Sequence, residues 1–133
     1  QTLLEIQEIK EQEALKIRKQ KEREMEIEIE AKADILIEQA YQIEAASTLY
    51  TIGYDKPPKS MRDLMPDYIK KLEPPIDSVL GWFIIPENGF PAISLSSVES
   101  KNETNKKLCD SINKKGKIHN IRCENNYIYK LNQ

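Results

Sequence analysis

An α+β fold with one unusually long N-terminal helix is the architecture that this sequence predicts, and three observations lead to it. Residues 1–52 contain neither Gly nor Pro and consist mainly of strong helix formers. All seven prolines lie between residues 57 and 91, and short alternating segments after residue 80 indicate about four antiparallel strands. Cys109 and Cys123 lie near the C-terminus, where they could close a loop. We therefore expect a long helix packed on a small antiparallel sheet of about four strands, with a disulfide-closed C-terminal loop.

The second half of the long helix carries an apolar face. Residues along it recur mainly at spacings of three and four: Met25, Ile29, Ala33, Leu36, Ala40, Ile43, Ser47 and Tyr50. Six of these are expected to pack the helix against the head, namely Ile29, Ala33, Leu36, Ala40, Ile43 and Tyr50. A neighbouring line broadens the face and favours burial under a sheet over a narrow coiled-coil seam; it comprises Ile37, Tyr41, Ala45 and Ile52.

The first half of the helix is different, because residues 18–24 contain no apolar side chain. Residues 1–30 hold nine acids and six bases, whereas residues 101–133 hold eight bases and three acids. A helix without an apolar face cannot bury itself in a head. The sequence therefore predicts two parts: residues 1–24 form a protruding helix that acts as the assembly element, and residues 25–133 form the head, including the second half of the helix.

The head begins where Gly53 is predicted to end the helix. Residues 59–75 read as a connection with one or two helical turns, in which Ser60 and Asp63 resemble an N-terminal capping arrangement. Strands are predicted at residues 80–85 and 92–98, joined by a Pro- and Gly-containing turn.

A second helix and a second hairpin complete the predicted head. Ser100 and Glu103 form a capping-box pattern for a helix through Asn113, and Gly116 is expected to release the chain. Strands then follow at residues 117–123 and 127–131, around a tight turn at Asn125 and Asn126, since Asn tolerates left-handed backbone angles.

Few residues are candidates for a disulfide, for catalysis or for ligand binding. Cys109 and Cys123 are expected to form a disulfide in an oxidising compartment, the alternative being two unrelated buried thiols. His119 is predicted to be a surface residue of a strand, and Trp82 and Phe83 are expected to point to opposite faces of another strand. The sequence contains no GxSxG, Walker, HExxH or dinucleotide-binding motif, so we expect no enzyme, catalytic residue, metal or cofactor.

Composition argues against two classes of partner. No window approaches the ~18 consecutive apolar residues of a membrane helix, so a soluble chain is expected, and a leader removed before Gln1 would leave no trace. Nucleic acid is not expected as a partner either. Arg122 is the sole Arg of the basic C-terminal region, which lacks the interleaved aromatic residues of single-strand binders.

Three segments resemble the type IV pilins and their pseudopilin relatives. Gln1-Thr-Leu-Leu-Glu5-Ile6 is similar to the start of a mature pilin after leader cleavage. Phe90-Pro-Ala-Ile-Ser-Leu-Ser, followed by a helix with Leu108-Cys109, resembles the type IVb pilins, and Cys123-Glu-Asn-Asn-Tyr-Ile-Tyr resembles the end of the pilin disulfide region. Together with the order of elements, the similarity covers nearly the whole chain.

This resemblance implies a structural subunit of a non-covalent, type IV pilus-like extracellular filament. It implies assembly residues at Gln1, which would carry a methylated N-terminus, and at Glu5. The implied location is the filament or the periplasm of a bacterium. The implied partners are further copies or other pilin subunits, the pilus or secretion assembly machinery and, for cell adhesion, a host-surface receptor.

One departure and two alternatives accompany this interpretation. Residues 7–30 are highly charged where the first half-helix of a pilin is apolar, which argues against a membrane-anchored stage for this segment. Within the family, the alternative is a minor pilin or pseudopilin that primes a type II secretion or pilus machine. Outside the family, it is a secreted coiled-coil adaptor or adhesion module.

Overall fold

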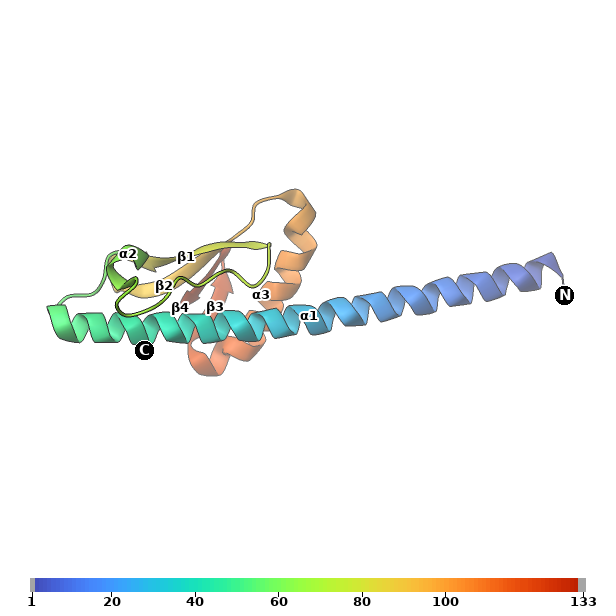
Figure 1. Ribbon diagram of the computed structural model, residues 1–133. Coiled ribbons are helices and arrows are strands. Elements are labelled where there is room, and N and C mark those ends of the chain that lie inside the picture. The colour runs from blue at the N-terminus through green and yellow to red at the C-terminus, as the bar shows by residue number, and fades with distance from the viewer. Residues whose placement is uncertain (1, 132–133) are drawn as a thin grey trace.

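The structure, a computed structural model, describes residues 2–131, so the assembly role predicted for Gln1 falls outside the described residues. One long helix, α1 (Leu3–Tyr54), runs the length of the molecule, and a small head lies along its C-terminal half (Figure 1). The head contains a four-stranded antiparallel sheet and a second helix. The predicted α+β fold, with a long N-terminal helix on a four-stranded sheet, is confirmed.

The head alternates short helices with two β-hairpins. Its elements are α2 (Met61–Leu64), β1 (Val79–Ile85), β2 (Phe90–Leu95), the 3-10 helix η1 (Glu99–Lys101), α3 (Asn102–Gly116), the 3-10 helix η2 (Lys117–His119), β3 (Ile121–Glu124) and β4 (Tyr127–Lys130). The strand order is β1-β2-β4-β3, with every neighbouring pair antiparallel. Helix α3 connects the two hairpins, which meet where β2 pairs with β4.

Helix α1 continues one residue past Gly53 and ends at Tyr54. The chain turns at Asp55, whose backbone is left-handed with φ 60°, and the Asp55 N–H donates to the Thr51 carbonyl at 2.8 Å. Asp is among the residues that adopt this conformation most readily after Gly. The prediction that Gly53 ends the helix was therefore wrong by a small margin.

The core lies between α1, α3 and the inner face of the sheet. The buried residues of α1 are Ile29, Ala33, Leu36, Ile37, Ala40, Ile43, Ala46 and Ser47. All of them except Ser47 share one apolar cluster with Trp82, Ile93 and Ile128 of the sheet and with Leu108 and Ile112 of α3. Most of the face predicted from the sequence, including five of its six expected packing residues, is thus buried, while Tyr50 is half-buried beside the cluster.

The buried face is narrower than the sequence predicts. Of the neighbouring line, only Ile37 is buried, whereas Tyr41, Ala45 and Ile52 are exposed and Ala46 is buried instead. At about 100° per residue, Ala45 and Ile52 lie on the side of the helix opposite to Ile43. The small head covers one side of α1 and leaves the other open.

Neither predicted capping box forms. Ser60 makes no side-chain cap, and Asp63 Oδ2 instead accepts a hydrogen bond from the Lys59 N–H at 2.9 Å. Ser100 lies inside η1, and α3 starts at Asn102 without a side-chain cap. In the second case the preceding 3-10 turn replaces the expected serine cap.

The third strand starts later than predicted. Lys117 and His119 belong to η2, and Asn120, with φ 57°, turns the chain into β3. Gly116 allows close packing, because a Cβ there would lie 2.8 Å from the Ile121 carbonyl oxygen.

The second strand is also shifted from its predicted position, to residues 90–95. By contrast, Asn125 and Asn126 have φ 53° and 67°, which confirms the predicted turn.

Candidate assembly surface

The N-terminal half of α1 makes no buried contact with the head. Every residue from Thr2 to Glu28 is exposed, and Ile29 is the first buried residue. At 1.5 Å per residue, residues 3–28 project about 39 Å (Figure 1). We call residues 3–28 the free arm.

The free arm begins with a capping box. Thr2 Oγ1 accepts a hydrogen bond from the Glu5 N–H, and Glu5 Oε2 accepts one from the Thr2 N–H, both at 3.3 Å. This reciprocal arrangement satisfies backbone donors at the helix start. Glu5 therefore has a local role in the helix cap, and its role in subunit docking stays a prediction.

Charges on the arm and its junction with the head fall into three blocks. Residues 5–13 hold four acids and one base, residues 16–23 hold five bases and one acid, and residues 24–30 hold four acids and no base. Between residues 2 and 131, the ion pairs all involve head residues, and none joins two arm residues. The arm thus presents alternating acidic and basic segments to a partner.

Exposed apolar residues follow two opposite faces of α1. The first set, which we call the back line, consists of Ile6, Ile9, Ile17, Ile27 and Ile35, each between 37% and 67% exposed. At about 100° per residue they fall within an arc of about 80°, facing away from the buried face. The second set, the front line, consists of Leu4, Leu15 and Met25, and it continues the direction of the buried face along the arm.

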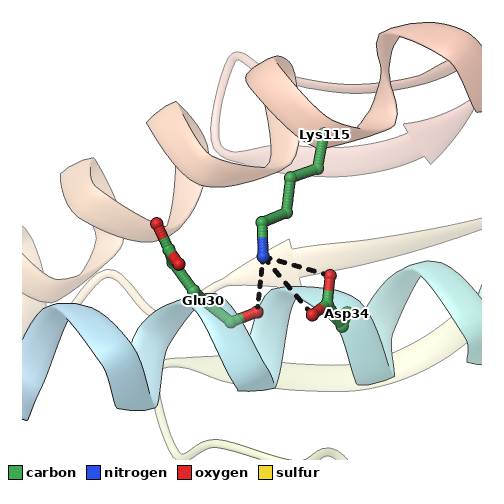
Figure 2. A network of polar contacts seen from close by, with 3 residues as sticks. All are labelled: Glu30, Asp34 and Lys115. Atoms are coloured by element: carbon green, nitrogen blue, oxygen red, sulfur yellow. Dashed lines mark hydrogen bonds and ion pairs between the residues drawn. The ribbon is translucent and has the colours of Figure 1, made fainter.

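Lysines from α3 fix α1 where the arm leaves the head. The Lys115 ammonium lies 3.2 and 3.3 Å from the two carboxylate oxygens of Asp34 and 3.4 Å from the Glu30 carbonyl oxygen (Figure 2). Closer to the N-terminus of α1, Lys107 Nζ lies 3.8 Å from Met25 Sδ. These contacts hold α1 against α3 and set the direction of the arm relative to the head.

The predicted disulfide joins Cys109 of α3 to Cys123 of β3. Asn113 reinforces the same junction, because its side chain accepts from the Cys123 N–H at 2.8 Å and donates to the Cys123 carbonyl at 3.0 Å. The alternative of two unrelated thiols is thereby excluded. The bond attaches the second hairpin to the helix that contacts α1.

His119 lies in η2 and contacts α1. It is hydrogen-bonded through Nδ1 to the Tyr41 hydroxyl, and the two rings meet edge to face with centroids 5.2 Å apart. These contacts pack His119 against α1.

No group of three or more His, Cys, Asp or Glu side chains within residues 2–131 is arranged to hold a metal ion.

The outer face of the sheet is partly aromatic. Trp82 is buried and Phe83 is 39% exposed, as expected for adjacent residues on opposite faces. Phe83 meets Tyr127 edge to face at 6.0 Å, and the Tyr129 hydroxyl donates to Glu124 Oε2 at 3.0 Å. Burial, followed by this carboxylate, raises the pKa of Tyr129. An open depression of about 420 Å³ lies over this face.

No helix within residues 2–131 combines the length and the apolar character needed to cross a membrane. Comparison with known proteins gives no relative: no family model matches the chain, and no curated protein or solved structure matches it. The pilin interpretation accordingly rests on the segments quoted from the sequence and on the arrangement of helix, sheet and disulfide.

Sequence reasoning missed two features of the arm. The capping box was present as the pattern Thr2-Leu-Leu-Glu5, which is the general form of this cap. The back line was present as isoleucines at helical spacing, but Glu13, Gln20 and Glu24 interrupt it. A search for helical periodicity across those polar positions would have found the line.

Proposed function

We propose that this protein is a structural subunit of a non-covalent, pilus-like extracellular filament, in which the free arm is the assembly element. The observation that carries the proposal is the arm itself. Its 26 residues are all exposed, and they continue without a break from a helical half that is fixed in the head. The arm therefore offers a contact surface that the protein's own core does not use.

The energetics of the arm favour a partner. Most helical stability in proteins comes from tertiary packing of an apolar face rather than from helix propensity. Eight large apolar side chains of the arm are between 37% and 86% exposed, namely Leu3, Leu4, Ile6, Ile9, Leu15, Ile17, Met25 and Ile27. Fully burying a Leu or Ile side chain stabilises by about 1.5–3 kcal/mol. Association along the arm therefore has a substantial driving force.

The distribution of these residues favours an extended assembly. The back line and the front line lie on opposite faces of the arm, so one subunit can contact neighbours on two sides. Contacts through two different surfaces extend an array when the rotation between subunits does not close a ring. The head, carried on one side of α1, would then face outward from the arms.

The proposed setting follows from the pilin resemblance. An extracellular or periplasmic location suits the Cys109–Cys123 bond, because disulfides persist in oxidising compartments. The proposed partners are further copies or related subunits and the assembly machinery. The aromatic outer face of the sheet is the surface that we propose for a host-surface receptor.

Electron microscopy of a native cell extract and of the concentrated pure protein tests this function. We expect fibres. The front-line variant Leu4→Gln/Leu15→Gln should form shorter fibres or none, because it removes apolar contacts between arms. Both changes lie on the arm and away from the core, so the fold should be unaffected. A matched control is Leu80→Gln, which alters an exposed leucine of the head. Particles that stay at one small size at every concentration would contradict a filament subunit.

A further inference from the structure

We propose that the back line is the docking face for a second copy of the same chain, whose α1 lies antiparallel along it. This inference rests on the proposed function only in taking the arm as the assembly element. It adds the occupant, the orientation and the register of one of the two contacts. The resulting pair would be a two-fold unit from which a filament grows through the front lines.

The spacing of the isoleucines is symmetric about one residue. Ile9 and Ile35 have their midpoint at residue 22, and so do Ile17 and Ile27. A two-fold axis at that residue therefore places Ile9 opposite Ile35 of the second copy and Ile17 opposite Ile27 of the second copy. Symmetry repeats each contact, so four isoleucine pairs form along the interface.

The charges on the same face disfavour parallel pairing in register. Glu13, Glu24 and Glu38 lie in line with the isoleucines and are exposed. Parallel helices in register would set each of these carboxylates against its own copy, and facing like charges destabilise helix pairs. The antiparallel register instead sets Glu13 against Ala31, Glu24 against Gln20 and Glu38 against Ile6 of the second copy. Near the axis, Lys21 and Arg23 of both copies flank the two Glu24 carboxylates.

The shape of α1 permits the contact over a long distance. The full series of face positions is 6, 9, 13, 17, 20, 24, 27, 31 and 35, which advances 29 residues in eight steps. This average of about 3.6 residues per step matches a straight α-helix, so the two helices can stay in contact without supercoiling. The contact from residue 6 to residue 38 would be about 48 Å long.

The head leaves this face free. Ile35 is 41% exposed, and Glu38, Gln42 and Ala45 are also exposed on the side of α1 away from the sheet. The arm of one copy can therefore lie along the back of the head-bearing half of the other copy. The two heads would project from opposite ends and opposite sides of the pair.

Cysteine cross-linking tests the orientation directly, because both native cysteines are already joined to each other. Ile17→Cys and Ile27→Cys are prepared as separate full-length variants, oxidised mildly, and run without reductant, alone and mixed. We expect a covalent dimer in the mixture and no covalent dimer from either variant alone. A second mixture, of Ile9→Cys with Ile35→Cys, should behave in the same way. The mismatched mixture of Ile9→Cys with Ile27→Cys should give no dimer.

Each other result has a definite meaning. A dimer from Ile17→Cys alone would indicate parallel pairing and would overturn the proposal. No dimer from any mixture, in protein that still forms fibres, would also overturn it while leaving the proposed function intact. Absence of both cross-links and fibres, with the protein monomeric throughout, would overturn the proposed function as well. Protein that fibres and cross-links only in the two matched mixtures supports both.

Discussion

Lys130 of β4 forms an ion pair with Glu44 of α1, with Nζ 3.3 Å from Oε2. The lysine side chain is only 4% exposed, and its ammonium also lies 5.7 Å from the centre of the Tyr41 ring. A buried charge is costly unless a partner neutralises it. This pair therefore ties the last strand of the sheet to the long helix.

Replacing Glu44 by Gln should destabilise the protein by about 2–3 kcal/mol, since the buried Lys130 charge would lose its partner. Glu44 keeps some exposure, which places the expected cost below that of a fully buried pair. Urea unfolding measures the change. The matched control is Glu73→Gln, which breaks the exposed Lys71–Glu73 pair and should change stability by less than about 0.5 kcal/mol. The combined Glu44→Gln/Lys130→Met variant should recover much of the loss, and a loss equal to that of Glu44→Gln would contradict this explanation.

Reduction of the Cys109–Cys123 bond should lower stability by about 3 kcal/mol, the value that the chain-entropy model gives for a loop of this size. Thermal unfolding with and without reductant measures the effect, and the two-hydrogen mass difference verifies the reduction. Cys109→Ala/Cys123→Ala should match the reduced protein. An unchanged unfolding midpoint after verified reduction would show that the bond does not stabilise the head.

The division of α1 into a buried and an open face predicts opposite results for two isoleucines. Ile43 is fully buried, so Ile43→Ala should cost about 2–5 kcal/mol through lost burial and a cavity. Ile52 is 74% exposed, so Ile52→Ala should change stability by less than about 0.5 kcal/mol. Denaturant unfolding of both variants is the measurement. Similar losses would contradict the observed orientation of the helix.

Asp77 should titrate below its usual value of 3.8, because the Lys101 ammonium donates a hydrogen bond to it at 2.7 Å and attracts its charge. A carboxyl with a lowered folded-state pKa stabilises the fold above its unfolded-state pKa. That contribution is lost as the pH falls through the lowered pKa. NMR titration should show the Asp77 pKa rising toward 3.8 in Lys101→Met. An identical Asp77 pKa in both proteins would rule out Lys101 as the cause.

Glu5→Gln separates the two roles considered for Glu5. Glutamine can still complete the capping box with Thr2, so the helix content measured by circular dichroism should stay unchanged. If the charge is used in subunit docking, fibre formation should fall. Thr2→Ala is the complementary variant, which removes the cap and keeps the Glu5 charge. Normal fibres from Glu5→Gln would remove the docking role of the carboxylate.

Local patterns predicted much of the fold. Ile29, Ala33, Leu36 and Ile43 were identifiable as a buried face because helical spacing brings them to one side, whatever covers them. The turn at Asn125 and Asn126 followed from the backbone angles that Asn tolerates. These features depend on residues close together in the sequence.

The remaining features depend on contacts between distant residues. The late start of β3 comes from η2 and the left-handed turn at Asn120, beside which Gly116 packs closely against Ile121. Burial of Lys130 could not be predicted, because its partner Glu44 lies 86 residues earlier in the chain. On the arm, helical periodicity can find the back line in spite of Glu13 and Glu24, but only the exposure of these residues shows that the head leaves the line open.

Sedimentation velocity of the full chain over a wide concentration range tests most directly whether the exposed half of α1 is an assembly element. We expect association that grows with concentration and that is weakened in Ile9→Glu/Ile17→Glu, a variant whose circular dichroism and unfolding midpoint should match those of the wild type. A wild-type chain that sediments as a monomer at every concentration, or a variant that associates as strongly as the wild type, would contradict the account.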